Sequence, residues 1–172
     1  MPQNRIEQKN KLIASLNAQI KKRSDSNELE RLLRFVDYYY KVSPLEELKE
    51  RSLENLYGST LSCFSWLQEW QGERRKLRVF NPSIETHGWH CSHTVIQLLH
   101  QNMPFIVDTV RMELNRRCKV IHVVHSGVLR VDPDSAQVLD EGSNDGAEVS
   151  LLYIEIDRTT DPQDLKELRE GL

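Results

Sequence analysis

The spacing of apolar residues changes near residue 73, and this change limits the folds open to the chain. Before it, apolar residues recur every three to four positions, as over residues 29–40, which is the pattern of amphipathic helices. After it, residues 76–80 alternate between polar and apolar, which predicts a half-buried strand. We therefore expect a helical segment over residues 1–73 and a unit of strands and helices over residues 74–172.

Four helices are expected in the first segment. The third begins at Ser43-Pro44, because a serine can cap the free amides of a helix and proline suits its first turn. The fourth begins near Leu53 and contains Gly58, whose small size would permit close contact with another helix.

The second unit is predicted to alternate strands with two helices. Strands are expected at 76–80, 94–99, 120–124, 128–131 and 149–156, with a turn at Ser126-Gly127 between the third and the fourth; helices are expected at 104–117 and from Pro162 onward. Because each element must bury one apolar face, the economical fold class is α+β, a mixed antiparallel sheet with two helices on one face. The last helical pattern still runs at Leu172, so we expect the sandwich to be truncated there.

Glycine and cysteine usage exclude several classes of protein. The seven glycines form neither GxGxxG nor GxxxxGK, so no nucleotide cradle, and no cofactor, is predicted in this chain. No apolar run is long enough to span a membrane, and the N-terminus lacks a signal-peptide pattern, so a cytoplasmic location with no membrane partner is expected. Three widely spaced cysteines predict free thiols.

The first 23 residues are basic, with six Lys and Arg against Glu7. Such an arm could contact nucleic acid or anionic lipid. No aromatic residues are interleaved with these charges, as nucleic-acid binding would favour. We therefore expect a solvated helix that docks on an acidic surface of its own chain or a partner, and no nucleic-acid partner.

All six histidines lie between residues 87 and 125. The run His87-Gly88-Trp89-His90-Cys91-Ser92-His93 invites an alternative function, a small metal-dependent or thiol enzyme. The spacing differs from that of standard zinc sites, and His122 and His125 should point to opposite faces of one strand. We therefore predict no metal site and half-buried structural histidines, with His87, Trp89 and His93 anchoring the loop.

The strand-to-helix connection after residue 101 is the strongest candidate for binding. The first amides of the following helix lack internal partners, so its positive end could hold a carboxylate. A tight turn with Phe105 in the core is the competing interpretation. Arg111 could offer its guanidinium to a carboxylate of an effector or partner. The candidate effector or interface residues are Asn102, Met103, Pro104, Phe105, Asp108 and Arg111.

Five segments resemble a known family. Residues 50–58, 78–82, 87–89, 93–95 and above all 103–117 (MPFIVDTVRMELNRR) resemble the N-terminus of the very large bacterial NAD-specific glutamate dehydrogenases. The resemblance implies an ACT-like (ferredoxin-like) βαββαβ sandwich over residues 74–172, of a type that binds amino acids where two such domains meet.

The resemblance also implies a role. This chain would be a non-catalytic regulatory or oligomerisation module with no catalytic residues. The rest of the parent enzyme would use NAD to convert glutamate to 2-oxoglutarate and ammonia. The implied partners are that remainder, further copies in a homo-oligomer, and an amino-acid effector; a stand-alone amino-acid-sensing ACT module is an alternative.

One departure from the family pattern concerns the candidate loop. Ligand-binding ACT domains usually carry glycine directly after the proline of this loop, whereas Phe105 follows Pro104 here. A large side chain would fill the space that an amino acid needs, which favours a structural or interdomain role over sensing. The closing strand of the sandwich is expected either beyond Leu172 or replaced by residues 76–80.

Overall fold

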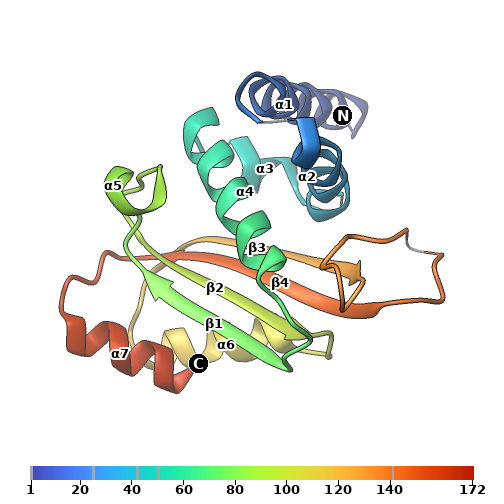
Figure 1. Cartoon of the computed structure of the whole chain (residues 1–172). Helices are drawn as coiled ribbons and strands as arrows, with labels where there is room; N and C mark the ends of the chain where they lie inside the picture. The colour runs from blue at the N-terminus through green and yellow to red at the C-terminus, as the bar shows by residue number, and fades with distance from the viewer. Residues whose placement is uncertain (1, 25, 42, 50, 141) are drawn as a thin grey trace.

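The computed structural model describes residues 2–24, 26–41, 43–49, 51–140 and 142–172. Seven helices and four strands are present in this part of the chain (Figure 1). The helices are α1 (Pro2–Arg23), α2 (Ser26–Tyr39), α3 (Leu45–Lys49), α4 (Leu53–Gln68), α5 (Ile84–His87), α6 (Ile106–Arg116) and α7 (Pro162–Gly171). The strands are β1 (Arg75–Phe80), β2 (Thr94–Gln101), β3 (Ile121–Val131) and β4 (Ala147–Ile156).

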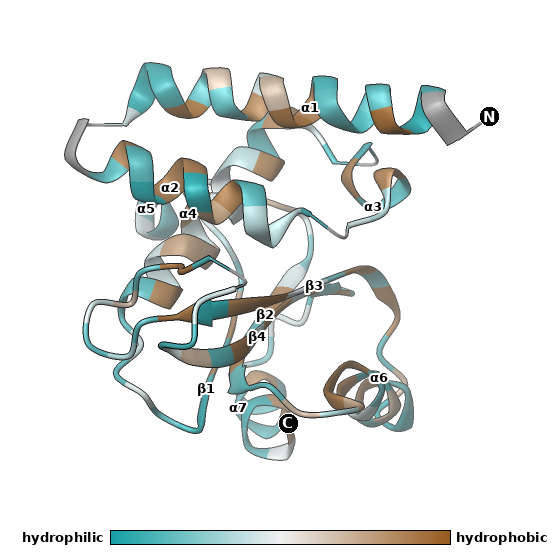
Figure 2. Cartoon of the chain, turned by 90° about the vertical axis from the view of Figure 1, so that its right-hand side faces the viewer, coloured by the Kyte–Doolittle hydropathy of each residue, from teal (hydrophilic) through white to brown (hydrophobic). Residues whose placement is uncertain are grey.

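The four strands form one sheet in the order β1-β2-β4-β3, and every neighbouring pair is antiparallel. Helices α6 and α7 lie on one face of the sheet, and α1–α4 lie on the other (Figure 1). In Figure 2 much of the strands between these two layers is brown, the colour of hydrophobic residues. The predicted α+β sandwich with two helices on one face is therefore confirmed, and the helical segment covers the opposite face.

Strand β1 fills the place of the closing strand. In a βαββαβ sandwich the last strand pairs with the first strand of the motif, which is β2 here. β1 occupies this position, antiparallel to β2 over Arg75–Phe80. Helix α7 packs beneath it, since Leu168 and Val79 share one apolar cluster and Arg169 donates to the Val79 carbonyl at 3.3 Å. The early strand has thus replaced the closing strand.

Helix α4 holds the helical layer on the sheet. Ser52 caps it by accepting a hydrogen bond from the Asn55 amide at 3.2 Å. A Cβ added to Gly58 would lie 2.4 Å from the Cβ of Trp89. Gly58 therefore allows the loop before β2 to pack closely on α4, whereas we expected it to permit close contact with another helix. Trp66, on the same helix, is buried in the core.

The basic helix α1 rests on acidic residues of its own chain. Arg5 pairs with Glu46, and Arg23 donates to both oxygens of Glu54 at 3.0 and 3.2 Å. The expected docking on an acidic surface is confirmed. In the described part of the chain, no helix is both long and apolar enough to cross a membrane.

Strand β3 differs from expectation in two ways. It continues through Ser126-Gly127 without a turn, because Gly127 lets β3 approach α2: an added Cβ would lie 2.8 Å from the Tyr39 ring. Its pairing with β4 shifts register between Ile121 and Val123, as in a β-bulge, which re-aims side chains.

This register shift changes where His122 and His125 lie, so the expectation that they point to opposite faces of the strand is wrong. His125 packs against Tyr39 and Tyr40 of the helical layer. His122 stacks on His93, which bonds Glu155. Glu155 in turn faces Arg51 of the same layer. Both histidines therefore lie on the same face of the sheet, whereas a regular strand would place them on opposite faces.

Helix α5 was not anticipated from the sequence. The Ser83 hydroxyl accepts from the Thr86 amide at 3.3 Å, and Gly88 ends the helix in the left-handed conformation at φ 74°. A single turn of four residues is too short to show a helical period.

Candidate functional site

An open groove of about 610 Å³ lies beside the start of α6. Its walls come from the loop before α6, the outer halves of β3 and β4, and the end of α2. Its lining includes the predicted residues Asn102, Met103, Phe105 and Asp108, together with Tyr38, Lys41, Val128, Arg130, Glu148 and Ser150. Four of the six predicted effector or interface residues are thus brought together in one groove.

Asn102 fixes the loop to the end of the sheet. Its backbone amide donates to the Glu148 carbonyl at 2.8 Å, and its side-chain amide donates to the Glu148 carboxylate at 3.2 Å. Its Oδ1 accepts a hydrogen bond from the Ser150 hydroxyl at 2.9 Å. These contacts use the polar atoms of Asn102, so its role in the groove is to position the loop.

Phe105 is the residue before α6 and has an unusual conformation. Its backbone is left-handed, with φ 63° and ψ 13°, and no side-chain hydrogen bond caps the helix there. Bulky side chains avoid this region because Cβ crowds the backbone, whereas glycine adopts it readily. Phe105 is 77% exposed and lines the groove, so it does not fill a buried space as we expected.

The groove carries charges of both signs. Arg130 Nη2 lies 2.6 Å from Glu148 Oε1, and Lys41 and Asp108 also line the walls. Exposed apolar side chains lie beside these charges: Met103 is 45% exposed and Val128 is 55% exposed. Such a mixture of an apolar floor and paired charges suits a polypeptide surface or a small zwitterion.

Pro104 and Arg111 lie outside the groove lining. Pro104 is exposed within the same loop. Arg111 lines a separate hollow of about 270 Å³ with Glu46, Glu47 and His122. Asp108 and Arg111 are three residues apart and so lie on neighbouring parts of the α6 surface, but they line different hollows.

The three predicted loop anchors are held by separate contacts. The His87 ring stacks on Phe80 at 4.7 Å, and its Nδ1 accepts from the Ser83 amide at 3.2 Å. Trp89 is buried against Gly58. His93 Nδ1 lies 2.7 Å from Glu155 Oε2. Burial lowers the pKa of His87.

The geometry does not favour the alternative of a metal or thiol enzyme. Within the ranges that the structure describes, no three His, Cys, Asp or Glu side chains are placed to share a metal ion. Cys91 is buried, its Sγ donates to the His93 carbonyl at 3.4 Å, and burial raises the pKa of the thiol. A protonated, buried thiol is a poor nucleophile.

The comparisons with known proteins agree with the fold. Residues 35–172 match the family model described as glutamate dehydrogenase, ACT1 domain. The chain belongs to this family. The matched part is the ACT1 domain and not the whole enzyme, as the resemblance implied.

Two relatives carry the name NAD-specific glutamate dehydrogenase. The protein from Halomonas elongata is 39% identical over 167 residues, covering 94% of this chain and 10% of that protein. The protein from Pseudomonas aeruginosa is 38% identical over 144 residues, covering 80% of this chain and 9% of that protein. The chain therefore spans about a tenth of the length of these relatives. No solved structure matches it.

Sequence reasoning missed most of the groove: only four of its fifteen lining residues were among those predicted. Tyr38 lies in the last turn of α2, Lys41 follows that helix, and Arg130 and Glu148 come from neighbouring strands. Only the strand order β4-β3 and the close approach of Gly127 to Tyr39 bring these residues to the loop. The spacing of apolar residues along the sequence carries no signal for such long-range contacts.

Proposed function

We propose that this chain is a regulatory and assembly module of an NAD-dependent glutamate dehydrogenase, and that the groove beside α6 contacts another part of the enzyme. The parent reaction would be the oxidative deamination of glutamate to 2-oxoglutarate and ammonia. NAD would bind to the remainder of that protein, in keeping with the missing glycine fingerprint here. A cytoplasmic setting would suit its three free cysteines.

One observation carries this proposal: Phe105 is held in a strained backbone conformation and is 77% exposed. Strained residues persist where surrounding structure supports them, and they cluster at functional sites. Exposed aromatic rings are enriched at protein interfaces. Met103 and Val128 extend the apolar surface around the ring, so a polypeptide partner would gain by covering it.

The test uses the full-length dehydrogenase that contains this chain. We expect Phe105→Ser to alter its oligomeric mass or its glutamate-dependent reduction of NAD. Met112→Ser is the matched control, because Met112 lies on α6 close to Phe105 and is 71% exposed but lies outside the groove. Light scattering after size-exclusion chromatography and a spectrophotometric assay measure the two effects. If both variants have the same oligomeric mass and the same rate of NAD reduction, the proposed contact between the groove and another part of the enzyme is wrong.

Binding of an amino-acid effector is a second candidate. The groove places Lys41 and Arg130 among Asp108 and Glu148, a pattern that suits the two charges of an amino acid. Because the large Phe105 side chain lines the groove where amino-acid-binding domains of this type usually carry glycine, we expect small or no thermal shifts in a screen of amino acids. A large saturable shift that is lost in Arg130→Met, but kept in Arg111→Ala, would favour sensing instead.

A further inference from the structure

Strand β3 is one of the two edges of the sheet, since the order β1-β2-β4-β3 gives it a single neighbour. The Asn102 amide donates to the Glu148 carbonyl, so the backbone of Glu148 points away from β3. Its cross-strand partner Arg130 therefore points outward, and the Arg130 carbonyl accepts from the Leu139 amide at 2.8 Å. Because every second residue of an antiparallel strand points the same way, three further residues of β3 turn their backbone amides and carbonyls outward: Val124, Ser126 and Val128.

These outward groups at the centre of β3 are open to a partner. Nearer the end of the strand, Val131 bridges to Val138 of the following loop, and at its start the register shift follows Ile121. Over residues 124–128, and within the described part of the chain, no other segment hydrogen-bonds to the outward backbone groups. The central stretch of β3 is therefore the part that can add a strand.

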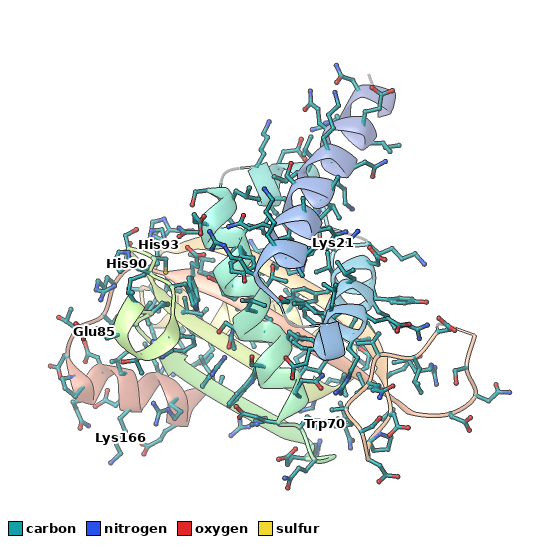
Figure 3. The ribbon with its side chains drawn as sticks, turned by 45° about the horizontal axis from the view of Figure 1, so that its top comes forward. Lys21, Trp70, Glu85, His90, His93 and Lys166 are labelled. Carbon is teal, nitrogen blue, oxygen red and sulfur yellow. The ribbon has the colours of Figure 1, made fainter. Side chains whose placement is uncertain are left out.

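The other edge strand, β1, is protected against such pairing. Three of its six residues are Arg or Lys, and Arg169 of α7 donates to the Val79 carbonyl at 3.3 Å. Figure 3 labels Lys166 on the same helix, which lies against β1. Charges on an edge strand oppose pairing with another chain. Residues 121–129 of β3 (IHVVHSGVL) contain no Lys, Arg, Asp, Glu or Pro, so this edge lacks that protection.

Two hollows wrap around the open edge of β3. The groove of about 610 Å³ is lined by Val128, on the α6 face of the strand, and by Tyr38 from the helical layer on the other face. The hollow of about 270 Å³ is lined by residues 121–124, by Glu47 of α3 and by Arg111 of α6. Figure 2 shows β3 between α3 and α6. A strand added to this edge would therefore lie between the two layers of helices.

We propose that an extended segment of the parent dehydrogenase, from outside this chain, pairs with residues 124–128 as a further strand of the sheet. This inference rests on the proposed function and gives the form of the contact that the groove makes. In strand addition, backbone hydrogen bonds provide affinity and side-chain pockets provide specificity. The chain covers only 10% and 9% of the two named relatives, so most of the parent polypeptide is available to supply the segment.

The two walls beside the edge define the chemistry of this segment. On the α6 face, Phe105 is 77% exposed and Met103 is 45% exposed, beside Val128, so apolar side chains of the segment would be covered there. On the other face the groove is lined by Tyr38 and Lys41, which suit polar side chains. Successive residues of a strand point to opposite faces. The segment should therefore alternate apolar and polar residues.

Hydrogen exchange of the full-length dehydrogenase tests the pairing. We expect the amides of Val124, Ser126 and Val128 to exchange at least about tenfold more slowly in the full-length enzyme than in the 172-residue chain. The amides of β2, which has a neighbour on both sides, should exchange slowly in both proteins and report a folded sheet. Equal exchange of residues 124–128 in the two proteins would overturn the proposal.

A charge on the edge supplies the matched variant. Val128→Lys in the full-length enzyme should return exchange of residues 124–128 to the rate of the 172-residue chain, because lysine on an edge opposes pairing. Val120→Lys is the control, since Val120 is 54% exposed against 55% for Val128 and lines neither hollow. Protection that survives Val128→Lys would contradict the added strand.

Two other outcomes separate this inference from its neighbours. If Phe105→Ser alters the full-length enzyme while residues 124–128 stay unprotected, the groove is an interface without an added strand, so the proposed function stands and this inference fails. Light scattering of the 172-residue chain should show a monomer. A dimer that Val128→Lys dissociates would assign the edge to a second copy of the chain and would also overturn the inference.

Discussion

At the scale of single residues, two side chains are held in positions that cost free energy. Phe105 occupies the left-handed region, which disfavours L side chains by about 1–2 kcal/mol. Arg51 is buried with a guanidinium that donates to the Asn55 carbonyl, contacts Ser59 and covers the Tyr153 ring at 4.7 Å. The first residue is supported by the surrounding loop, and the second by a network of polar partners.

Replacing Phe105 by glycine should relieve its strain. The greater conformational entropy of glycine in the unfolded chain opposes this gain by about 0.4–1 kcal/mol. We therefore expect Phe105→Gly to raise the free energy of unfolding by a net amount of about 0–1 kcal/mol. Phe105→Ala removes the ring but keeps a Cβ at φ 63°, so it should show no gain. Urea denaturation measures both. Equal stability of the two variants would argue against backbone strain.

Removing Arg51 should leave the buried Glu155 without its cation. Breaking a buried charge pair by deleting one partner costs about 3–5 kcal/mol, and we expect Arg51→Met to destabilise the chain by that amount in chemical denaturation. Adding Glu155→Gln should recover part of the loss, because the orphaned charge is then gone. Arg111→Met, at an exposed position, is the control and should change stability little.

At the scale of elements, contacts between helix and loop hold the layers together. One of them joins Gly58 of α4 to Trp89 before β2. Arg78 of β1 stacks on Trp66 of α4 at 4.3 Å and on Phe80 at 4.8 Å, and Phe80 stacks on His87. This row of rings joins α4, β1 and α5 along one edge of the sheet.

A methyl group at position 58 should separate α4 from the loop. Gly58→Ala gains about 1 kcal/mol of helix propensity, but its Cβ would lie 2.4 Å from the Trp89 side chain. Overpacking of this kind costs about 1–3 kcal/mol, so we expect a net loss and a change in tryptophan fluorescence. Gly142→Ala, which meets nothing within 4 Å, should leave both unchanged.

The elements were predictable from sequence to different degrees. Helical spacing indicated α2 and α6, and alternation indicated β1, because each follows one apolar face over several turns or residues. The bulge at His122 leaves no pattern, because the residues on both sides of the histidine are apolar and β-branched, so neither face of the strand stands out over residues 120–124. A turn was predicted at Gly127 because the sequence alone does not show that Tyr39 of α2 packs against this residue.

At the scale of the whole molecule, acid should weaken the contact between helical layer and sheet. His125 is buried between Tyr39 and Tyr40, its Nδ1 lies 3.2 Å from the Ser43 hydroxyl, and burial lowers its pKa from the usual 6.5. The unfolded chain then binds a proton more readily than the folded chain. Stability is fully present above about pH 6.5 and is lost as the pH falls below it.

Denaturation at several pH values checks this expectation. Between pH 6.5 and pH 5, the wild-type chain should lose up to about 1.4 kcal/mol per pH unit more than His125→Phe. Phenylalanine keeps a ring between Tyr39 and Tyr40 but cannot be protonated. His100→Asn, which removes a histidine near the chain surface, should retain the wild-type slope. Parallel slopes for wild type and His125→Phe would contradict the assignment.

The position of β1 in the sheet also determines which fragments of this chain resist aggregation. Residues 94–99 of β2 are all buried, with β1 on one side and β4 on the other. A fragment that begins at the first strand of the βαββαβ motif would expose this apolar strand as a bare edge, and bare apolar edges aggregate. Shortened versions of the domain should therefore start before Arg75 to remain usable in solution.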